Sequence, residues 1–299
     1  MKNIKNRNDD EPFYKSVYET ALARLKAGEC VENIYDDRGI NISKNLSMLV
    51  NQRTFGKTLD LGCGLGQAAV SLSVKSKEVI AADISKDALK TVSEVIRRKN
   101  IDNIHPVLLD ATHLPFRNNV FDLIICSGVL EWVAMDKNSN LQTGKVQLNM
   151  LKETCRVLTQ NGVFWLGIEN RYAYTYFLGC VDHHSGLRFI TLLPRFIANM
   201  YSKLLKKKPY RNYLYTYWEL KKLLRNAGFA IDSFLAAFPY YSNPKLVAPL
   251  SNFDKIKKMI ILSSDRFRFS TIILQIITSL HLTKIFYPSF IVLCHKVNY

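Results

Sequence analysis

Short apolar runs alternate with amphipathic stretches along most of the chain. The apolar runs have the length and composition of buried parallel strands. We predict strands at residues 58–61, 78–83, 105–109, 120–126, 163–168, 230–238 and 289–297. Apolar residues between them recur at the spacing of one helix face, which predicts helices at residues 13–26, 67–73, 86–99, 145–158 and 217–226. Strands that alternate with helices in this way predict an α/β fold around a largely parallel sheet.

Polar residues at the ends of two predicted helices support their boundaries. Ser85 can cap the helix at 86–99, whose last turn carries the basic sequence RRK that suits the helix dipole. Thr216 and Glu219 have the spacing of a capping box at the start of the helix at 217–226. The polar segment 159–162 predicts a turn between the preceding helix and the strand at 163–168.

The sequence TLDLGCGLG at residues 58–66 joins a predicted strand to the helix at 67–73. Gly62, Gly64 and Gly66 allow a tight turn and the close approach of a ligand, which a Cβ would hinder. Asp83 ends the next predicted strand, where it can accept hydrogen bonds from ribose hydroxyls. We therefore predict an adenosine pocket at this edge of the sheet.

The spacing of the glycines and the residue before them bear on which adenosine cofactor fits. Dinucleotide-binding loops read GxGxxG and present helix N–H groups to a pyrophosphate. Here the spacing is GxGxG, and Asp60 stands just before the loop. S-adenosylmethionine has no phosphate and carries a cationic amino-acid end, so a carboxylate beside the loop suits it better. The loop therefore favours S-adenosylmethionine over a dinucleotide.

With this loop, Asp83, LLDATHLPF and the helix–LTQNG–strand unit, the chain resembles class I S-adenosylmethionine-dependent methyltransferases. The segment CSGVLEWV is similar to the small-molecule branch (methyltransferase type 11), which typically reads S-x-V-L-E-H-V. Methyltransferases acting on amines of DNA bases carry an Asn/Asp-Pro-Pro-aromatic motif there instead. The resemblance implies a Rossmann-like fold with a mostly parallel seven-stranded sheet, an antiparallel last strand, and insertions after strands five and six.

The resemblance also implies a domain organisation. Residues 1–44 would form an N-terminal tail and helix, with the first twelve residues disordered and the helix packed at the edge of the core or over the cofactor. Residues 45–299 would form the methyltransferase domain. Within it we expect a core at 45–169, an insertion at 170–215 that roofs the acceptor site, and a last part at 216–299 with strands six and seven. A second, basic insertion at 239–288 separates these two strands.

A set of residues that contact the cofactor follows from the same resemblance. Asp110 would bind the adenine amino group, and Trp132 stands where the small-molecule branch has histidine. Glu131 would either line the methionine end or cap a helix. The residues expected to bind S-adenosylmethionine are Asp60, Gly62, Cys63, Gly64, Gly66, Asp83, Ile84, Asp110, Ala111, Cys126 and Ser127.

The insertion at 170–215 contains the candidates for a general base. Transfer to a hydroxyl needs positioning against the methyl group and a group that takes the hydroxyl proton. His183 and His184 are the first candidates, with Asp182 and Glu169 as alternatives. Adjacent side chains on an extended segment point in opposite directions, so at most one of the two histidines faces a given site, and we expect no metal site here. Both histidines could equally be ordinary loop residues.

Charge is concentrated in the last third of the chain. The net charge is +16, and residues 201–299 hold sixteen Lys and Arg against four Asp and Glu. This excess predicts a polyanionic partner, either nucleic acid, an anionic membrane surface or a phosphorylated substrate, or else a solvated basic face. The apolar segment at 271–282 is expected to pack on the core. Its alternative is to lie on a membrane, with its basic flanks at Arg266, Arg268 and Lys284.

Cysteine usage and the ends of the chain bear on its compartment. The six cysteines form no CxxC pair, which favours a reduced chain over a disulfide scaffold. The polar N-terminus lacks the apolar segment of a signal peptide, and no apolar run is long enough for a membrane span. We expect a cytoplasmic protein, with the inner face of the membrane as the alternative.

Three functions remain open from the sequence. The leading one is methyl transfer to a hydroxyl of a small molecule, sugar or lipid-linked glycan, because the segments IENRYAY, FLGCVDHHSGL and TLLPR look similar to methyltransferases of bacterial surface-glycan and secondary-metabolite genes. An acceptor that carries phosphate would suit the basic region. The second function is RNA methylation by way of that region. The third is a methyltransferase-like binding module without catalysis.

Overall fold

The computed structural model describes residues 13–50, 54–134, 142–262 and 268–297. The predicted disordered tail at 1–12 and Arg266 lie outside these ranges. The predicted helices and strands are present with boundaries shifted by a few residues. The helices have the bounds α1 Phe13–Lys26, α2 Arg38–Leu49, α3 Gln67–Ser73, α4 Lys86–Lys99, α5 Thr143–Val157, α6 Tyr174–Phe177, α7 Arg195–Lys206, α8 Tyr217–Asn226, α9 Phe253–Leu262, α10 Arg268–Ser279 and α11 Thr283–Phe286.

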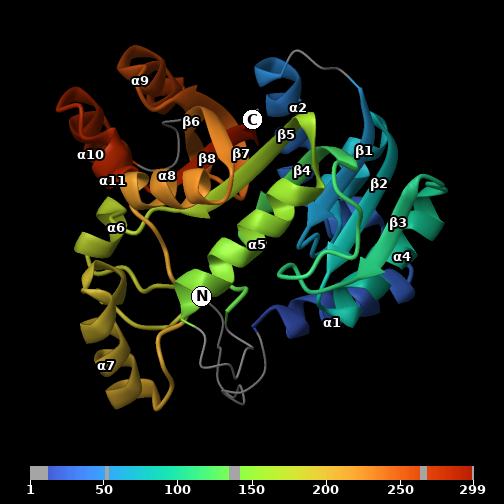
Figure 1. Ribbon diagram of the computed structural model, residues 1–299, viewed down its shortest axis with the longest axis horizontal. Helices are drawn as coiled ribbons and strands as arrows, with labels where there is room; N and C mark the ends of the chain where they lie inside the picture. Colours follow the sequence, from blue (N-terminus) through green and yellow to red (C-terminus); the bar gives the residue numbers. More distant parts are fainter. Residues whose placement is uncertain (1–12, 51–53, 135–141, 263–267, 298–299) are drawn as a thin grey trace.

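A single mixed sheet forms the centre of the fold (Figure 1). Its order is β3-β2-β1-β4-β5-β8-β6-β7. Strands β1 to β5 are parallel, and β8 runs antiparallel to both of its neighbours, β5 and β6. The predicted α/β class and the antiparallel last strand are therefore confirmed. The strands have the bounds β1 Phe55–Leu61, β2 Ser76–Asp83, β3 Ile104–Leu108, β4 Phe121–Ser127, β5 Leu158–Glu169, β6 Phe229–Tyr240, β7 Asn243–Pro249 and β8 Ser289–Lys296.

The sheet has eight strands in the described ranges, where seven were predicted. The additional strand, β7, pairs antiparallel with β6 and lies in the segment assigned to the second insertion. Its sequence NPKLVAP contains Pro244 and Pro249, which argue against a central strand. Because β7 is the outer edge of the sheet, one side of it needs no hydrogen-bond partner, and prolines are tolerated.

Apolar side chains on the two faces of the sheet pack against different helices. On one face, Ile124 and Leu166 belong to the core that includes α5 and α8. On the other, Ile125 and Trp165 belong to the core that includes α2 and α3. The sides alternate along β4 and β5 because successive strand residues point in opposite directions. The result is a three-layer arrangement in which loops at the carboxyl ends of the strands remain available for a site.

The predicted helix caps are present, whereas the predicted turn at 159–162 takes another form. The Ser85 side chain accepts a hydrogen bond from the Ala88 backbone N–H, and Thr216 with Glu219 makes the full capping box. Residues 159–162 lie within β5, where Phe121 pairs with Leu158 but Leu123 already pairs with Val163. The polar segment is therefore a bulge in the strand, which accommodates extra residues without ending it.

The two insertions form helices on the same side of the molecule, at the left of Figure 1. The first contains α6 and α7, and the second contains α9, α10 and α11. Leu274 on α10 is buried in the main core, as expected for a segment that packs on the fold. None of the helices in the described ranges combines the length and apolar character that crossing a bilayer requires.

Candidate functional site

A cavity of about 380 Å³ opens at the carboxyl ends of β1, β2 and β4. Parallel α/β sheets place ligands at this edge, and the volume lies in the range of roughly 300–1,000 Å³ that is typical of ligand sites. The loop after β1, the end of β2, the segment after β3 and the segment after β4 supply its wall, and α1 adds one side chain. The lining residues are Tyr18, Leu61, Gly62, Ala82, Asp83, Ile84, Leu109, Asp110, Ala111, Gly128, Val129, Trp132 and Val133.

The glycine-rich loop forms one wall of this cavity. Gly62 has φ +74°, and a Cβ there would lie 2.3 Å from Cγ2 of Val129. The loop is held to β2 because the backbone N–H groups of Gly62 and Cys63 both donate to the carbonyl oxygen of Ala82. Only glycine allows the loop to approach the segment after β4 this closely. The cavity thus has the backbone-lined cradle that an adenosine cofactor requires.

Asp83 lies at the end of β2 with its carboxylate at the cavity wall. Its two oxygens accept hydrogen bonds from the Gly64 N–H at 2.9 Å and the Ser85 N–H at 2.8 Å. Burial raises the pKa of Asp83, and these backbone hydrogen bonds partly oppose the rise. Because a carboxylate oxygen accepts more than one hydrogen bond, Asp83 can still accept from ligand hydroxyls.

The structure places five of the predicted cofactor residues on the cavity wall, namely Gly62, Asp83, Ile84, Asp110 and Ala111. The others are not among its lining residues, namely Asp60, Cys63, Gly64, Gly66, Cys126 and Ser127. Their cofactor contacts stay predictions.

Asp60 has a clear structural role beneath the loop. Its carboxylate is buried and accepts a hydrogen bond from the Ala69 N–H in the first turn of α3. Burial raises the pKa of Asp60 to about 7, with the nearby Asp83 carboxylate adding to the effect. Asp60 therefore ties the loop to α3.

Tyr18 and the segment after β4 supply wall residues that the sequence did not identify. Tyr18 belongs to α1, the helix expected either at the edge of the core or over the cofactor. Its hydroxyl lies 3.4 Å from the position that a Cβ on Gly64 would take. Trp132 stands where the resembling family has histidine, and it lines the cavity beside Val129 and Val133. In the sequence, the replacement of the family's histidine by Trp132 was the feature that could have indicated this position.

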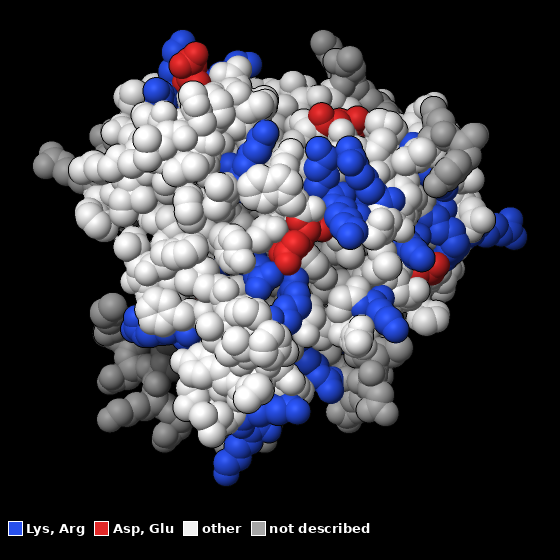
Figure 2. Space-filling model, turned by 60° about the vertical axis from the view of Figure 1, so that its left-hand side comes forward, with Lys and Arg blue, Asp and Glu red and all other residues white. Residues whose placement is uncertain are grey.

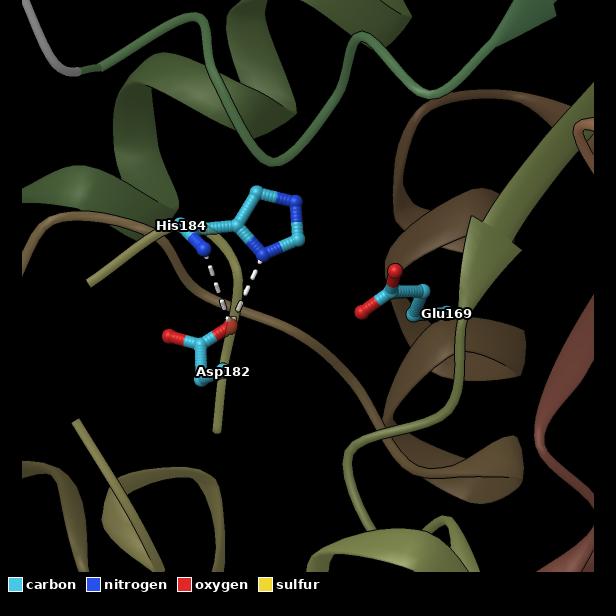
Figure 3. A group of neighbouring side chains, drawn as sticks. All are labelled: Glu169, Asp182 and His184. Atoms are coloured by element: carbon cyan, nitrogen blue, oxygen red, sulfur yellow. Dashed lines mark hydrogen bonds and ion pairs between the residues drawn. The ribbon is translucent and has the colours of Figure 1, made fainter. Parts of the chain in front are cut away.

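A buried polar cluster lies beyond Trp132 and contains Glu131, Glu169, Asp182 and His184. The Trp132 and His184 rings have centroids 4.8 Å apart. His184 Nδ1 lies 2.8 Å from Asp182 Oδ1, and His184 Nε2 lies 3.7 Å from Glu131 Oε1. Figure 3 shows the carboxylates of Asp182 and Glu169, which come from two different segments, near the ring of His184. The cluster joins the loop after β4, the end of β5 and the insertion after α6.

Charge in this cluster is balanced around the histidine. Burial acts to lower the pKa of His184, but its hydrogen bond to Asp182 and the interaction with Glu131 raise it to about 10. Burial acts to raise the pKa of Asp182, but hydrogen bonds with His184 and Ser185 lower it overall. Burial raises the pKa of Glu169. His184 therefore carries a positive charge at neutral pH.

Two tyrosines and one unpartnered oxygen complete the cluster. The Tyr241 hydroxyl donates to Glu131 Oε1 at 3.2 Å, and the Tyr176 hydroxyl donates to Glu169 Oε2. Glu131 Oε2 is buried and has no hydrogen-bond partner within the described residues. Glu131 caps none of the helices described, and it is absent from the lining of the first cavity. The structure places Glu131 in this cluster, and its contact with the methionine end of the cofactor stays a prediction.

A second cavity, of about 470 Å³, lies on the other side of the cluster. Its wall includes Glu169, Tyr176, His183 and Tyr241. It is close to the first cavity, since a Cβ on Gly128 would lie 2.9 Å from the Tyr241 hydroxyl. The two histidines thus have different surroundings, with His183 on the cavity wall and His184 inside the cluster.

Metal ligation is chemically open to part of the cluster. One ligand atom each of Glu169, Asp182 and His184 lie within 4.8 Å of one another. Carboxylate and imidazole groups suit several divalent metals. The imidazolium form of His184 would have to lose its proton first. In the structure, this positive charge already compensates the neighbouring carboxylates.

The raised pKa of His184 leads to a prediction about stability. A group whose pKa rises from 6.5 to about 10 on folding contributes stability below pH 6.5, and this contribution is lost as the pH rises toward 10. We expect the His184→Gln variant to be less stable than the wild type by a few kcal/mol near pH 6.5, and this difference to shrink toward pH 10. Urea unfolding across this range measures it. His295→Gln, an exposed histidine paired with Asp232, is the control. A difference that is independent of pH would contradict the ion pairing.

The comparisons with known proteins agree with this architecture. Residues 59–166 match the family described as Methyltransferase domain. Human mitochondrial arginine-hydroxylase NDUFAF5 is 44% identical over 85 residues, 27% of this chain and 22% of that protein. The tRNA 5-carboxymethoxyuridine methyltransferase of Escherichia coli (strain K12) is 30% identical over 148 residues, 47% of this chain and 51% of that protein. A solved S-adenosylmethionine-dependent methyltransferase from Clostridium acetobutylicum ATCC 824 has a TM-score of 0.54 at 15% identity, over 96% of this chain and 100% of that chain.

The extent of each match limits what it establishes. The chain spans 22% of the human relative and 51% of the E. coli one, and the solved structure shares the fold alone. The family match runs from β1 to β5, which carry the glycine-rich loop and the first cavity. Residues 59–166 therefore form a methyltransferase domain, and the fold of the chain resembles that of S-adenosylmethionine-dependent methyltransferases.

Proposed function

We propose that this chain binds S-adenosylmethionine in the first cavity and transfers its methyl group to a hydroxyl of a sugar-containing acceptor in the second. The observation that carries the proposal is the position of the two cavities on either side of Gly128 and Tyr241. A donor cavity and an acceptor cavity that meet at one point can hold two reactants in line, which supplies most of the rate in such a transfer.

The first cavity fits S-adenosylmethionine by its chemistry. In the proposed arrangement Asp83 accepts from the ribose hydroxyls, and Asp110 accepts from the adenine amino group. The glycine-rich loop leaves space for the ligand beside the backbone. The bound cofactor supplies a methyl group already activated by its sulfonium. The protein therefore has to bind, orient and exclude water, and no acid is needed for a leaving group.

Glu169 is the proposed proton acceptor for the acceptor hydroxyl. It lines the second cavity at the end of β5, and burial raises its pKa toward the range in which a carboxylate is an effective base. His184 is a weaker candidate than its place in the sequence suggested, because an imidazolium at neutral pH cannot accept a proton. We assign it a positioning role, with Asp182 and Glu131 as its partners.

Aromatic side chains on the second cavity support a sugar as the acceptor. Tyr174, Tyr176, Tyr240 and Tyr241 all lie on its wall. Tyrosines offer an apolar ring together with a hydroxyl, which suits the alternating C–H and O–H groups of a sugar. An RNA acceptor is the second candidate. The basic last third of the chain and the E. coli relative that is named a tRNA methyltransferase favour it.

Methyl-labelled cofactor separates these acceptors in one experiment. The protein is incubated with labelled S-adenosylmethionine and, in parallel, with a bacterial glycolipid extract, a water-soluble sugar fraction and total RNA. We expect label in a sugar-containing fraction and none in RNA. Label in RNA alone would replace the proposed acceptor. Saturable cofactor binding with no transfer to any fraction would favour a binding module.

A further inference from the structure

Exposed apolar side chains gather on the two insertions. Elsewhere in the described ranges large apolar side chains at the surface are scattered, as is normal for a folded protein. On α6, α7, α10 and the segments beside them they form a group, which we call the apolar face. Its residues are Phe177, Leu178, Phe189, Phe196, Met200, Leu204, Phe269, Ile272, Ile276 and Leu280.

Helix α7 has an exposed apolar side and an opposite side that packs on the protein. Phe196, Met200 and Leu204 recur every fourth residue, and they are 70%, 67% and 80% exposed. The opposite side of the helix packs inward through Ala198 and Ser202, which are buried. In a helix of a globular protein the apolar stripe normally faces the core. Here a full stripe of large apolar residues faces outward instead.

Helix α10 repeats this arrangement. Leu274 and Ile277 are buried, whereas Phe269, Ile272 and Ile276 are more than half exposed. The expected packing of this segment on the core is therefore correct for one side of the helix only. The exposed side of α10 is available to an apolar partner outside the protein.

The helices of the apolar face lie on one side of the molecule. In Figure 1, α7, α6, α11 and α10 follow one another along the left margin. Phe177 of α6 contacts Phe286 of α11, their ring centroids 5.5 Å apart, and Tyr174 of α6 interacts with Ser270 of α10. Figure 2, which turns this side forward, shows a broad uncharged surface with groups of Lys and Arg between and beside its parts.

The charges beside the apolar face are almost all positive. Between Asp182 and Glu219 the sequence has seven Lys and Arg and neither Asp nor Glu. Lys203 and Lys206 lie in the last turn of α7, where the apolar stripe ends, and Lys207 is the C-cap of the helix. In the described part of the chain, the ion pairs include none of these three lysines. Their charge is thus available to an external anion.

We propose that this apolar face docks on the surface of an anionic lipid bilayer. Large apolar side chains that enter the headgroup region, with lysines at the level of the lipid phosphates, are the combination that holds interfacial helices. A symmetric dimer through this face would bring its own lysines together, because both copies present the same patch. Charge therefore favours a lipid surface over a second copy of the chain.

This orientation would place the second cavity close to the membrane. Its wall includes Tyr174, Val181, Ser270 and Leu274, from the same insertions as the apolar face. An acceptor anchored in the bilayer by a lipid tail could then enter without leaving the membrane. This part rests on the proposed function. Docking itself does not, because it depends on neither cavity.

Vesicle sedimentation tests the docking. We use phosphatidylcholine vesicles with and without phosphatidylglycerol, and expect binding that requires the anionic lipid and weakens with salt. Phe196→Ser/Leu204→Ser and Lys203→Gln/Lys207→Gln should each lower the bound fraction at least about fivefold. Matched controls are Ile40→Ser/Met48→Ser, which changes two apolar residues of α2 that are also more than half exposed, and Lys44→Gln/Lys77→Gln. Both control variants should bind as the wild type does.

Three outcomes would overturn the proposal. They are no sedimentation with either vesicle, equal loss in the control variants, or a dimer in analytical ultracentrifugation that Phe196→Ser/Leu204→Ser converts to monomer. Calorimetry with S-adenosylmethionine on the same variants keeps the two proposals apart. Docking fails if vesicle binding is absent although the cofactor binds. The cofactor assignment fails if the cofactor does not bind, whatever the vesicles show.

Discussion

Replacing Asp83 by alanine is expected to weaken the binding of S-adenosylmethionine by about 100-fold or more. A hydrogen bond to a charged acceptor contributes about 1.5–3 kcal/mol, and the carboxylate at the end of β2 would accept from both ribose hydroxyls. In the alanine variant the ribose hydroxyls of the ligand would lose these acceptors. Isothermal titration calorimetry on the wild type and the variant measures the change directly.

The control has to account for the structural part that Asp83 plays. Its oxygens also accept from the backbone N–H groups of Gly64 and Ser85, so the alanine variant loosens the loop. Ser85→Ala removes a neighbouring hydrogen bond, the cap of α4, and leaves the carboxylate in place. We expect Ser85→Ala to lower the melting temperature with little change in affinity. Equal affinities of Asp83→Ala and the wild type would contradict the assigned role, and absence of binding to the wild type would contradict the proposed cofactor.

The parallel half of the fold could be predicted because its signals are local. Strands β1, β2 and β4 are largely buried apolar runs, and Ser85, Thr216 and Glu219 mark helix starts by their own hydrogen bonds. Strand β7 could not be predicted in this way. Its prolines are compatible with a strand only at a sheet edge, and the sequence does not state which strand is at the edge.

In the candidate site, too, the residues set by local sequence could be predicted, and those set by contacts between distant segments could not. Gly62, Asp83 and Asp110 belong to segments whose order along the chain already indicates one sheet edge. The polar cluster depends on distant contacts, since Glu131 meets Tyr241 across 110 positions of sequence. The pKa of His184 depends both on Asp182 in its own segment and on Glu131, which is distant in the sequence. This is why the sequence could name His184 but not its protonation state.

Removing the carboxylate of Glu169 is expected to have the largest effect on turnover. Glu169→Gln keeps the shape of the side chain and an oxygen that can accept from Tyr176, but it cannot take up a proton. If Glu169 is the base, kcat should fall by roughly 10²- to 10⁴-fold while the affinity for S-adenosylmethionine stays the same. Steady-state kinetics with the acceptor fraction identified by labelling, together with calorimetry, separates these two quantities.

The Tyr176→Phe variant tests the assignment of Glu169 as the base by a shift of the pH–rate profile, which a purely structural role of Glu169 would not produce. The Tyr176 hydroxyl donates to Glu169 and lowers its pKa, so removing it should raise that pKa further. The acidic limb of the pH–rate profile should then move to higher pH. Glu78→Gln, which removes a surface carboxylate paired with Lys57, should leave the profile unchanged. If Glu169→Gln retains full kcat and His183→Gln loses it, the base is the histidine on the same cavity wall, and Glu169 only shapes that wall.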